Sequence, residues 1–344
     1  MKKKEGVIMI NLGVIGCGQW GPNHIRNFTN LANCRVLACA DLNDKRLKSM
    51  KVLFRTIHPT KDYLEIIRHP KIDAVVVATP SSTHYRIVKE CLTAGKDVLC
   101  EKPLCLKKSE AKELIDLAGS LKKILMVGHV FLFNAGIRKL NELIRSGECG
   151  RIYYLHAKRT NLGPFRTDVN AVWDLASHDI SICNYLLNAM PVDVSARGGK
   201  YLQAGIEDVA FVCLKYPMGI LANIHVSWLD PKKVRQLTVV GDKQMIHWDD
   251  LDNVGPIKCY DRKVEPHYYY ETFGEFYLLA KEGNITIPKL NLHEPLKAQA
   301  VHFLECVQSR KEPTSDGKTG LDVIRVIDAI QKSLAHEGTP VPIK

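Results

Sequence analysis

Two short segments of the chain contain side chains able to transfer a proton. Lys102 lies in Glu101-Lys102-Pro103, and Asp174 and His178 lie in the segment 173–180. A histidine titrates near neutral pH and can take the proton of a substrate hydroxyl. If the segment is helical, Asp174 and His178 share a face, so the carboxylate can orient the imidazole and stabilise its charged form. These residue types suit the oxidation of an alcohol.

Each of these residues also has a purely structural interpretation. A lysine at a strand end is commonly a surface residue, and an Asp-x-x-x-His pair alone is more often a helix cap or a surface pair. Lys102 precedes a proline, which favours extended backbone and a fixed direction for the side chain. The catalytic interpretation therefore depends on whether the same chain binds a hydride acceptor.

A glycine-rich loop near the start of the chain predicts a dinucleotide site. The apolar run 11–15 suits a buried strand, and Pro22 can open a helix directly after the loop. Gly16 permits the tight turn, Gly18 lets the backbone approach a pyrophosphate, and Gly21 allows close packing of helix on strand. Gln19 and Trp20 complete the loop. The helix N-terminus then binds the phosphates through its free N–H groups.

The acidic residue that such a site needs follows the second predicted strand, 35–40. Asp41 comes 20 residues after Gly21, where a carboxylate accepts hydrogen bonds from the adenosine ribose. The next residue is Leu42 rather than arginine, so a 2′-phosphate meets a carboxylate without an adjacent cation. This pattern favours NAD over NADP as the cofactor. The structural alternative is a glycine-rich turn followed by a surface aspartate.

Strands continue to alternate with helices as far as Gly128, which predicts parallel βαβ units. Ligands of such sheets bind beyond the carboxyl ends of the strands. Residues expected there, and so expected to contact the cofactor, are Thr79, Pro80, His84, Glu101 and Lys102. We therefore predict an α/β fold with a Rossmann dinucleotide-binding domain at 9–128.

The second half of the chain has a different pattern. Predicted strands at 151–159, 208–216, 220–228 and 234–240 are separated by turn-like segments, among them Asp230-Pro231. Helices are expected at 136–146, from 173, at 295–309 and at 320–335. We predict an α+β domain at 129–344 with an open, mostly antiparallel sheet that binds the substrate and joins subunits.

Composition limits the classes of partner. The net charge is +11, but the lysines are scattered, and no helix-turn-helix, zinc-finger or basic-arm pattern appears, so we expect no nucleic-acid partner. The charge favours polyanionic small molecules. No apolar run approaches the roughly 18–20 residues of a membrane span. The 11 cysteines are an odd number without metal-binding spacing, which favours free thiols in the cytoplasm and no metal site. Residues 1–8 are a possible extension, with Met9 an alternative start.

The motifs together resemble one family of oxidoreductases. The chain resembles the glucose-fructose oxidoreductase / inositol dehydrogenase / MocA family from about residue 10 to the C-terminus. The resemblance lies in the glycine loop, in Ala78-Thr79-Pro80 with His84, in Glu101-Lys102-Pro103 and in Asp174-Leu175-Ala176-Ser177-His178-Asp179. The resemblance implies a Rossmann domain followed by an α/β domain whose open sheet often forms subunit interfaces. It also implies an active-site lysine at Lys102 and an Asp/His pair at Asp174 and His178.

Further segments are similar to a subgroup that oxidises C3 of UDP-linked N-acetylated sugars for an aminotransferase. These segments are Trp20-Gly21-Pro22-Asn23, 172–176, Glu294-Pro295-Leu296 and Ser315-Asp316-Gly317. Two residues depart from the pattern of these relatives: Ser177 stands where proline or glycine is more common, and Ala135 stands where proline is frequent. Substrate contacts are expected from Lys102, Asn134, Arg159, Arg166, Trp173, Asp174 and His178. The leading expectation is oxidation of UDP-N-acetylglucosamine with NAD by a homodimer or homotetramer. The alternatives are the corresponding uronate, which needs a cation for its carboxylate, a free sugar or inositol, and a non-catalytic nucleotide sensor.

Overall fold

The computed structural model describes residues 8–261, 263–266, 278–281 and 283–344. The possible N-terminal extension therefore lies, except for Ile8, outside the described residues. The chain forms two compact units. Unit 1 consists of the residues up to Phe133 together with His293–Ile324, and unit 2 consists of Asn134–Leu292 and Arg325–Lys344. The predicted division into 9–128 and 129–344 differs from these units because residues 293–324 group with unit 1.

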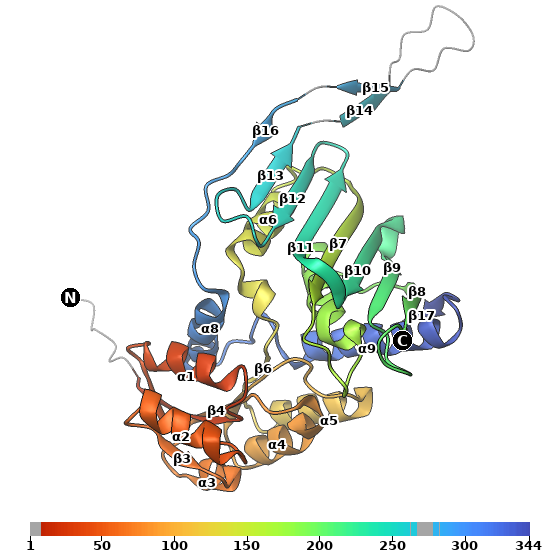
Figure 1. Cartoon of the computed structure of the whole chain (residues 1–344). Coiled ribbons are helices and arrows are strands. Elements are labelled where there is room, and N and C mark those ends of the chain that lie inside the picture. Colours follow the sequence, from red (N-terminus) through yellow and green to blue (C-terminus); the bar gives the residue numbers. More distant parts are fainter. Residues whose placement is uncertain (1–7, 262, 267–277, 282) are drawn as a thin grey trace, which may run out of the picture. The chain divides into compact units, whose positions relative to one another are not determined.

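Unit 1 contains a doubly wound sheet of six parallel strands in the order β3-β2-β1-β4-β5-β6. Figure 1 shows this unit with its helices packed around the strands. Its strands are β1 (Ile10–Ile15), β2 (Cys34–Ala40), β3 (His58–Thr60), β4 (Ala74–Val77), β5 (Asp97–Cys100) and β6 (Leu125–Val127). The short apolar strands β4, β5 and β6 are buried along their whole length, as expected of parallel strands covered on both faces. The strand order reverses between β1 and β4, which places a ligand crevice at the carboxyl ends of these two strands.

Five helices connect the strands of unit 1: α1 (Gly21–Thr29), α2 (Asp44–Leu53), α3 (Tyr63–Arg68), α4 (Ser81–Thr93) and α5 (Lys108–Ser120). The 3₁₀ turn η1 (Val130–Phe133), which follows β6, and the later helix α8 (Pro295–Ser309) also belong to this unit. Several of them begin where the sequence offers a cap. Asn43 caps α2 by accepting bonds from two backbone N–H groups, and Asp62 caps α3. Pro22 lies in the first turn of α1, as predicted.

Residues 293–324 belong to unit 1 because they make side-chain and backbone bonds to it. Glu294 accepts hydrogen bonds from Arg26 and Asn27 of α1, which holds the start of α8. The backbone N–H of Val127 donates a 2.7 Å bond to the carbonyl oxygen of Ser315, and the hydroxyl of Ser315 donates a 2.7 Å bond to the carbonyl oxygen of Val127. The chain after α8 therefore lies along the edge of β6. These contacts join positions far apart in the sequence, which local patterns do not reveal.

Unit 2 contains a nine-stranded sheet in the order β16-β13-β12-β11-β7-β10-β9-β8-β17. The strands are β7 (Ile152–Leu162), β8 (Asp193–Gly199), β9 (Val209–Lys215), β10 (Leu221–Ser227), β11 (Leu229–Gly241), β12 (Met245–Asp249), β13 (Ile257–Tyr260), β16 (Ile285–Thr286) and β17 (Val341–Pro342). A further pair, β14 (Lys263–Pro266) and β15 (Leu278–Lys281), is antiparallel. The predicted α/β class with an open, mostly antiparallel second sheet is confirmed.

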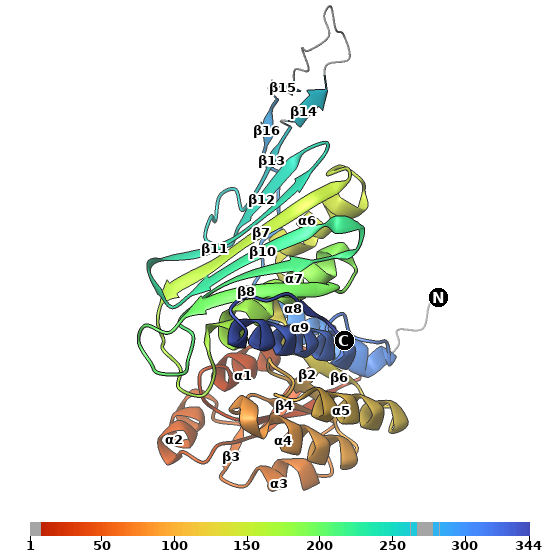
Figure 2. The same ribbon diagram turned by 90° about the vertical axis from the view of Figure 1, so that its right-hand side faces the viewer.

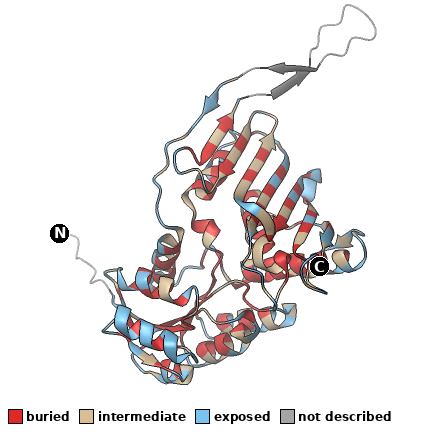
Figure 3. Ribbon diagram, in the orientation of Figure 1, coloured by how far each residue is buried: buried red, intermediate tan, exposed pale blue. Residues whose placement is uncertain are grey.

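One face of this large sheet is covered by helices. Figure 2 shows α6 (Ala135–Arg145) and α7 (Ser177–Leu187) on the same side of the strands. The helix α9 (Gly317–Ala335) crosses from unit 1 into unit 2. Buried and exposed residues alternate along β9 and β10, as Figure 3 shows, so the opposite face of these strands carries the more exposed side chains.

The strand order corrects one predicted turn. Asp230-Pro231 was expected to be a hairpin turn, but both residues belong to β11. The strand β10 pairs with β7 in parallel and with β9, whereas β11 pairs with β7 and β12. Because β7 lies between β10 and β11, these consecutive strands are not neighbours. The irregular pairing of β7 with β11 between Leu229 and Val234 accommodates the proline.

All eleven cysteines are free thiols, and ten of them are buried. No helix in the described part of the chain is both long and apolar enough to cross a membrane.

The ion pair between Arg310 and Asp97 predicts a measurable stability effect. Asp97 is 2% exposed, and its two carboxylate oxygens lie 2.7 and 2.8 Å from Nη1 of Arg310. In Arg310→Ala, the buried carboxylate of Asp97 loses the guanidinium. Of the partners described for it, the backbone N–H of Ile124 remains. We expect the free energy of unfolding to fall by about 1–3 kcal/mol, measured by urea denaturation of the full chain. Lys311→Ala is the control, and equal stabilities of the two variants would contradict the prediction.

Candidate active site

The glycine loop has the geometry that a pyrophosphate requires. It joins the end of β1 to the start of α1, and Gly16 has a positive φ of 98°. A Cβ on Gly16 would overlap the carbonyl oxygen of Ala78, and one on Gly21 would overlap the carbonyl oxygen of Gly16. Only glycine therefore fits at these two positions. The loop meets the N-terminus of α1, where free N–H groups attract anions. This cradle fits a dinucleotide.

Gln19 and Trp20 lie at the same helix start. The carbonyl of Gln19 accepts a 3.0 Å hydrogen bond from Nδ2 of Asn23, and Trp20 is the residue that precedes the first turn of α1. The indole of Trp20 is 40% exposed. Both residues therefore belong to the rim of the loop, where the sequence analysis placed them.

Asp41 lies at the end of β2 and is bound to the glycine loop. Its Oδ2 accepts a 2.8 Å bond from the backbone N–H of Cys17, and its Oδ1 accepts a 2.8 Å bond from the N–H of Asn43. The carboxylate is thus fixed beside the loop, as a ribose-binding residue must be.

The residue after Asp41 is Leu42, and we therefore expected no cation beside the carboxylate. The structure corrects this expectation. Arg46, in the first turn of α2, places Nη1 3.4 Å from Oδ2 of Asp41. A cation does accompany the carboxylate, because the turn capped by Asn43 brings α2 back over the end of β2. Arg46 was not predicted because it lies five residues after Asp41 and reaches the carboxylate only through the first turn of α2.

Thr79, Pro80 and His84 form the loop after β4 and the first turn of α4. The hydroxyl of Thr79 accepts a 2.8 Å bond from Thr83, and Pro80 immediately precedes α4. His84 is 1% exposed, and its ring nitrogens lie close to two backbone carbonyl oxygens, of Pro103 and Thr79. Its ring therefore bonds to the backbone of these two loops, and its contact with a cofactor stays a prediction.

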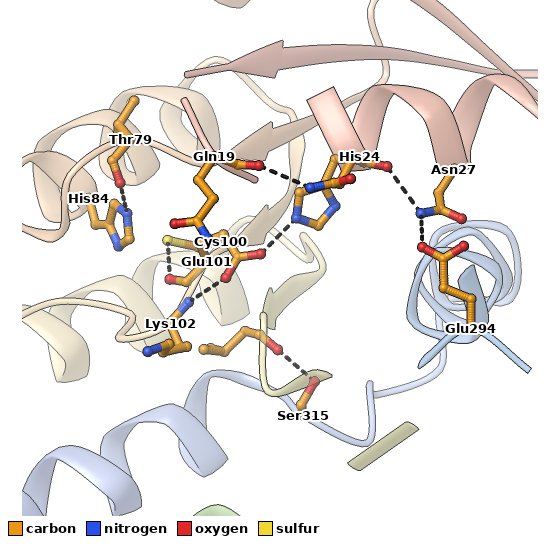
Figure 4. Close-up of polar contacts among 12 residues, drawn as sticks. Gln19, His24, Asn27, Thr79, His84, Cys100, Glu101, Lys102, Glu294 and Ser315 are labelled. Atoms are coloured by element: carbon orange, nitrogen blue, oxygen red, sulfur yellow. Dashed lines mark hydrogen bonds and ion pairs between the residues drawn. The ribbon is translucent and has the colours of Figure 1, made fainter. Parts of the chain in front are cut away.

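Glu101 and Lys102 follow β5 directly. Oε1 of Glu101 lies 2.7 Å from Nε2 of His24 in α1, and Oε2 accepts a 3.3 Å bond from the backbone N–H of Lys102 (Figure 4). Burial opposes ionisation, but His24 and Lys102 outweigh it and hold the pKa of the Glu101 carboxyl below its usual range. Glu101 is thus an anion inside unit 1. The Lys102–Pro103 peptide bond is cis.

Two histidines near this carboxylate were not recognised as site residues in the sequence analysis. His24 is one of them, and His129, which follows β6, is the other. His129 is 1% exposed. Burial and then the charge of Lys102 lower the pKa of His129 to about 4, so its ring is neutral near pH 7. Glu101 was selected because it follows the carboxyl end of β5. The same rule applied to β6 selects His129.

In unit 2, Asp174 lies in a π-helical turn, η2 (Val172–Ala176), that leads directly into α7. Its Oδ2 accepts a 3.2 Å bond from Nε1 of Trp228, and its Oδ1 lies 3.6 Å from Nη1 of Arg166. Trp173 and His178 are half-buried on either side. The expected helix is therefore present, but it starts with a wider turn of a kind frequent at functional sites.

Two predicted substrate contacts have other partners. Arg159 is 2% exposed, and its guanidinium makes two 2.8 Å bonds to Asp179. Asn134 caps α6, accepting bonds from two backbone N–H groups, and its amide donates a 2.9 Å bond to Asp250. These contacts assign structural roles to Arg159 and Asn134 and argue against the predicted substrate role. Arg166 is one-third exposed and lies beside Asp174, so it retains that expectation.

The predicted site residues thus form two groups. The glycine loop, Asp41, Thr79, His84, Glu101 and Lys102 surround the strand ends of unit 1. Trp173, Asp174, His178 and Arg166 lie together around η2 in unit 2. The described residues contain no group of three or more His, Cys, Asp or Glu side chains arranged to bind a metal ion.

Comparisons with known proteins agree with this geometry. Residues 10–129 match the model of an oxidoreductase family with an NAD-binding Rossmann fold, and residues 137–247 match the GFO/IDH/MocA C-terminal domain. Myo-inositol 2-dehydrogenase of Thermotoga maritima is 27% identical over 95% of this chain and 97% of its own length. UDP-N-acetylglucosamine 3-dehydrogenase of Acidithiobacillus ferrooxidans is 26% identical over 96% of this chain and 98% of its own length.

Solved structures share the fold. GenD2 from gentamicin A biosynthesis, in complex with NAD, superimposes with a TM-score of 0.82 at 21% identity and covers 98% of this chain and 97% of its own. The cofactor cradle, the strand order and both family matches lead to one assignment. The chain belongs to the GFO/IDH/MocA oxidoreductases, and its N-terminal unit is the NAD-binding Rossmann domain of that family.

Proposed function

We propose that this oxidoreductase uses NAD to oxidise the C3 hydroxyl of a UDP-linked N-acetylated sugar, best represented by UDP-N-acetylglucosamine. The observation that carries the substrate class is Arg166, a partly exposed arginine 3.6 Å from the carboxylate of Asp174. An arginine fork beside Asp174, the carboxylate proposed to orient His178, suits a phosphate or carboxylate group of the substrate. The full-length relative from Acidithiobacillus ferrooxidans, named for this reaction, supports the same choice.

NAD, when bound, supplies the acceptor for the hydride of the oxidised carbon. The residues that would hold it are Gly16, Gly18, Gly21 and Asp41. The chain's own side chains deal with the hydroxyl proton: Lys102 and His178 take part in its transfer, and Asp174 orients the histidine. Because coupled groups share their titration, the order of transfer between the lysine and the histidine is left open.

Inositol is a second candidate substrate because the myo-inositol dehydrogenase of Thermotoga maritima is as similar to this chain as the UDP-sugar enzyme. The uronate of the UDP-sugar is a third, since Arg166 could bind its carboxylate. The 3-keto product of a UDP-sugar is unfavourable at equilibrium, so a functional link to an aminotransferase that consumes the ketone is part of the proposal.

We also propose that the chain forms a homodimer or homotetramer through the open face of the nine-stranded sheet. Phe211 and Leu221 on that face are 53% and 45% exposed. The ring of Phe211 stacks on His225 with centroids 4.3 Å apart, so the flat rings of two neighbouring strands lie together on this face. Such a surface supports association of two sheets.

The cofactor site gives the first prediction of this subsection. Asp41→Ala removes the proposed ribose acceptor and releases Arg46 for a 2′-phosphate. We expect the Kd for NAD to rise roughly 10- to 100-fold, the effect of losing hydrogen bonds to a charged group, and the Kd for NADP to fall. Fluorescence titration with both dinucleotides measures this. Asp41→Ala combined with Arg46→Ala should lose the gain in NADP binding. An unchanged ratio of NAD to NADP affinity in Asp41→Ala would refute the assigned role.

The second prediction concerns the proton-transfer residues. Lys102→Ala and His178→Ala should each lower kcat by about 10²–10⁴, the usual contribution of a positioned acid or base. NAD binding, measured by titration, should change little. Lys107→Ala is a control in the same loop region, since Lys107 is exposed and pairs with Glu110. Near-wild-type turnover in either variant removes that residue from the proposed chemistry.

The third prediction concerns the substrate class. Enzyme and NAD are incubated with UDP-N-acetylglucosamine, its uronate, N-acetylglucosamine and myo-inositol, with 2-oxoglutarate or an aminotransferase present to draw the reaction forward. We expect NADH formation with a UDP-sugar, and a KM for it that rises about 10-fold in Arg166→Ala, the effect of one lost charge-assisted bond. Turnover of free sugars or inositol while both UDP-sugars are inert would overturn the substrate assignment and leave the oxidoreductase assignment intact.

A further inference from the structure

His84 joins the two loops that frame the cofactor crevice of unit 1. It projects from the first turn of α4, and its Nδ1 lies 2.7 Å from the carbonyl oxygen of Pro103, while its Nε2 lies 2.8 Å from that of Thr79. Figure 4 shows the bond to Thr79. Thr79 follows β4, and Pro103 follows the proposed proton-transfer residue Lys102. One side chain thus connects the ends of two neighbouring strands.

The chemistry of these two contacts depends on the protonation state of the ring. A carbonyl oxygen can only accept a hydrogen bond, and a neutral imidazole has a single N–H to donate. In the neutral form, one ring nitrogen of His84 would therefore direct its lone pair at a carbonyl oxygen less than 2.9 Å away. The imidazolium form has two N–H donors and satisfies both carbonyl groups.

A buried positive charge needs compensation, and the negative charge of Glu101 contributes to it. Burial, the largest influence on the ring, lowers the pKa of His84 below its ordinary value, against the opposing effects of the two carbonyl oxygens and the charge of Glu101. The geometry argues the other way, because both ring nitrogens face carbonyl oxygens and a neutral ring can donate to only one of them. Glu101 also faces His24 and Lys102, so the carboxylate is shared among several cationic or potentially cationic groups. Buried charges persist in proteins when they are hydrogen-bonded and paired in this way.

We propose that His84 is held as the doubly protonated imidazolium and acts as a positioning residue for Lys102. Its two charge-assisted bonds tie the loop after β4 to the backbone that follows Lys102, so that the lysine has a fixed place at the crevice. The positioning part of this inference rests on the proposed role of Lys102 in proton transfer. The charge state of His84 stands apart from that role.

Neutron diffraction from crystals of the full-length enzyme tests the charge state directly. At a pD of about 8, where an unperturbed histidine is neutral, we expect deuterium on both Nδ1 and Nε2 of His84. His129, whose pKa burial lowers to about 4, is the internal control and should carry a single deuterium. A single deuterium on His84 would overturn the proposal. This measurement needs no substrate, so its outcome does not depend on the proposed function.

The positioning role is tested with His84→Asn, whose amide group cannot reach both carbonyl oxygens. With whichever substrate of the screen turns over, kcat should fall roughly 10- to 100-fold, the effect of losing one bond to a charged group. KM and the Kd for NAD should stay within about 3-fold, because the glycine loop and Asp41 are unchanged. His58→Asn is the matched control. Unchanged kcat, or a loss of NAD affinity as large as the loss of kcat, would overturn the positioning role.

Discussion

The buried carboxylate of Glu101 is the constraint on which the arrangement of unit 1 depends. Its side chain is 12% exposed, so the negative charge must be compensated by the protein. The compensation comes from His24 in α1 and from Lys102, the residue that follows Glu101 in the chain. A Cβ on Gly128, after β6, would lie 3.0 Å from Oε2 of Glu101, so this neighbour has to be small. One anion therefore brings together α1, the end of β5 and the end of β6.

This arrangement explains why the cofactor loop and the lysine belong to one structural unit. The helix that presents its N-terminus to a pyrophosphate is the same helix that supplies His24 to Glu101. Residues 293–324 add to it, because Glu294 binds two side chains of that helix. A change at Glu101 is therefore expected to disturb the glycine loop and Lys102 together.

The sequence was sufficient for the features that depend on local pattern. Alternating apolar runs and helices predicted the Rossmann sheet, and the glycines predicted the turn from β1 into α1. Contacts between distant positions were not predictable in this way. Arg159 and Asp179 are 20 residues apart and form a buried pair that only the packing of α7 on β7 creates. The expected turn at Asp230 is likewise part of β11, because β7 lies between β10 and β11 and these two consecutive strands do not form a hairpin.

The same distinction separates the two arginines that were proposed as substrate contacts. Arg159 and Asp179 are both 3% exposed as side chains, and removing one partner of such a pair costs about 3–5 kcal/mol, so the guanidinium is not available to a ligand. Arg166 pairs instead with Asp168, whose side chain is 49% exposed. Exposed pairs contribute only about 0–1 kcal/mol. An anionic group of a substrate can therefore replace Asp168 at small cost, which makes Arg166 the arginine of this region suited to exchange its partner for a ligand.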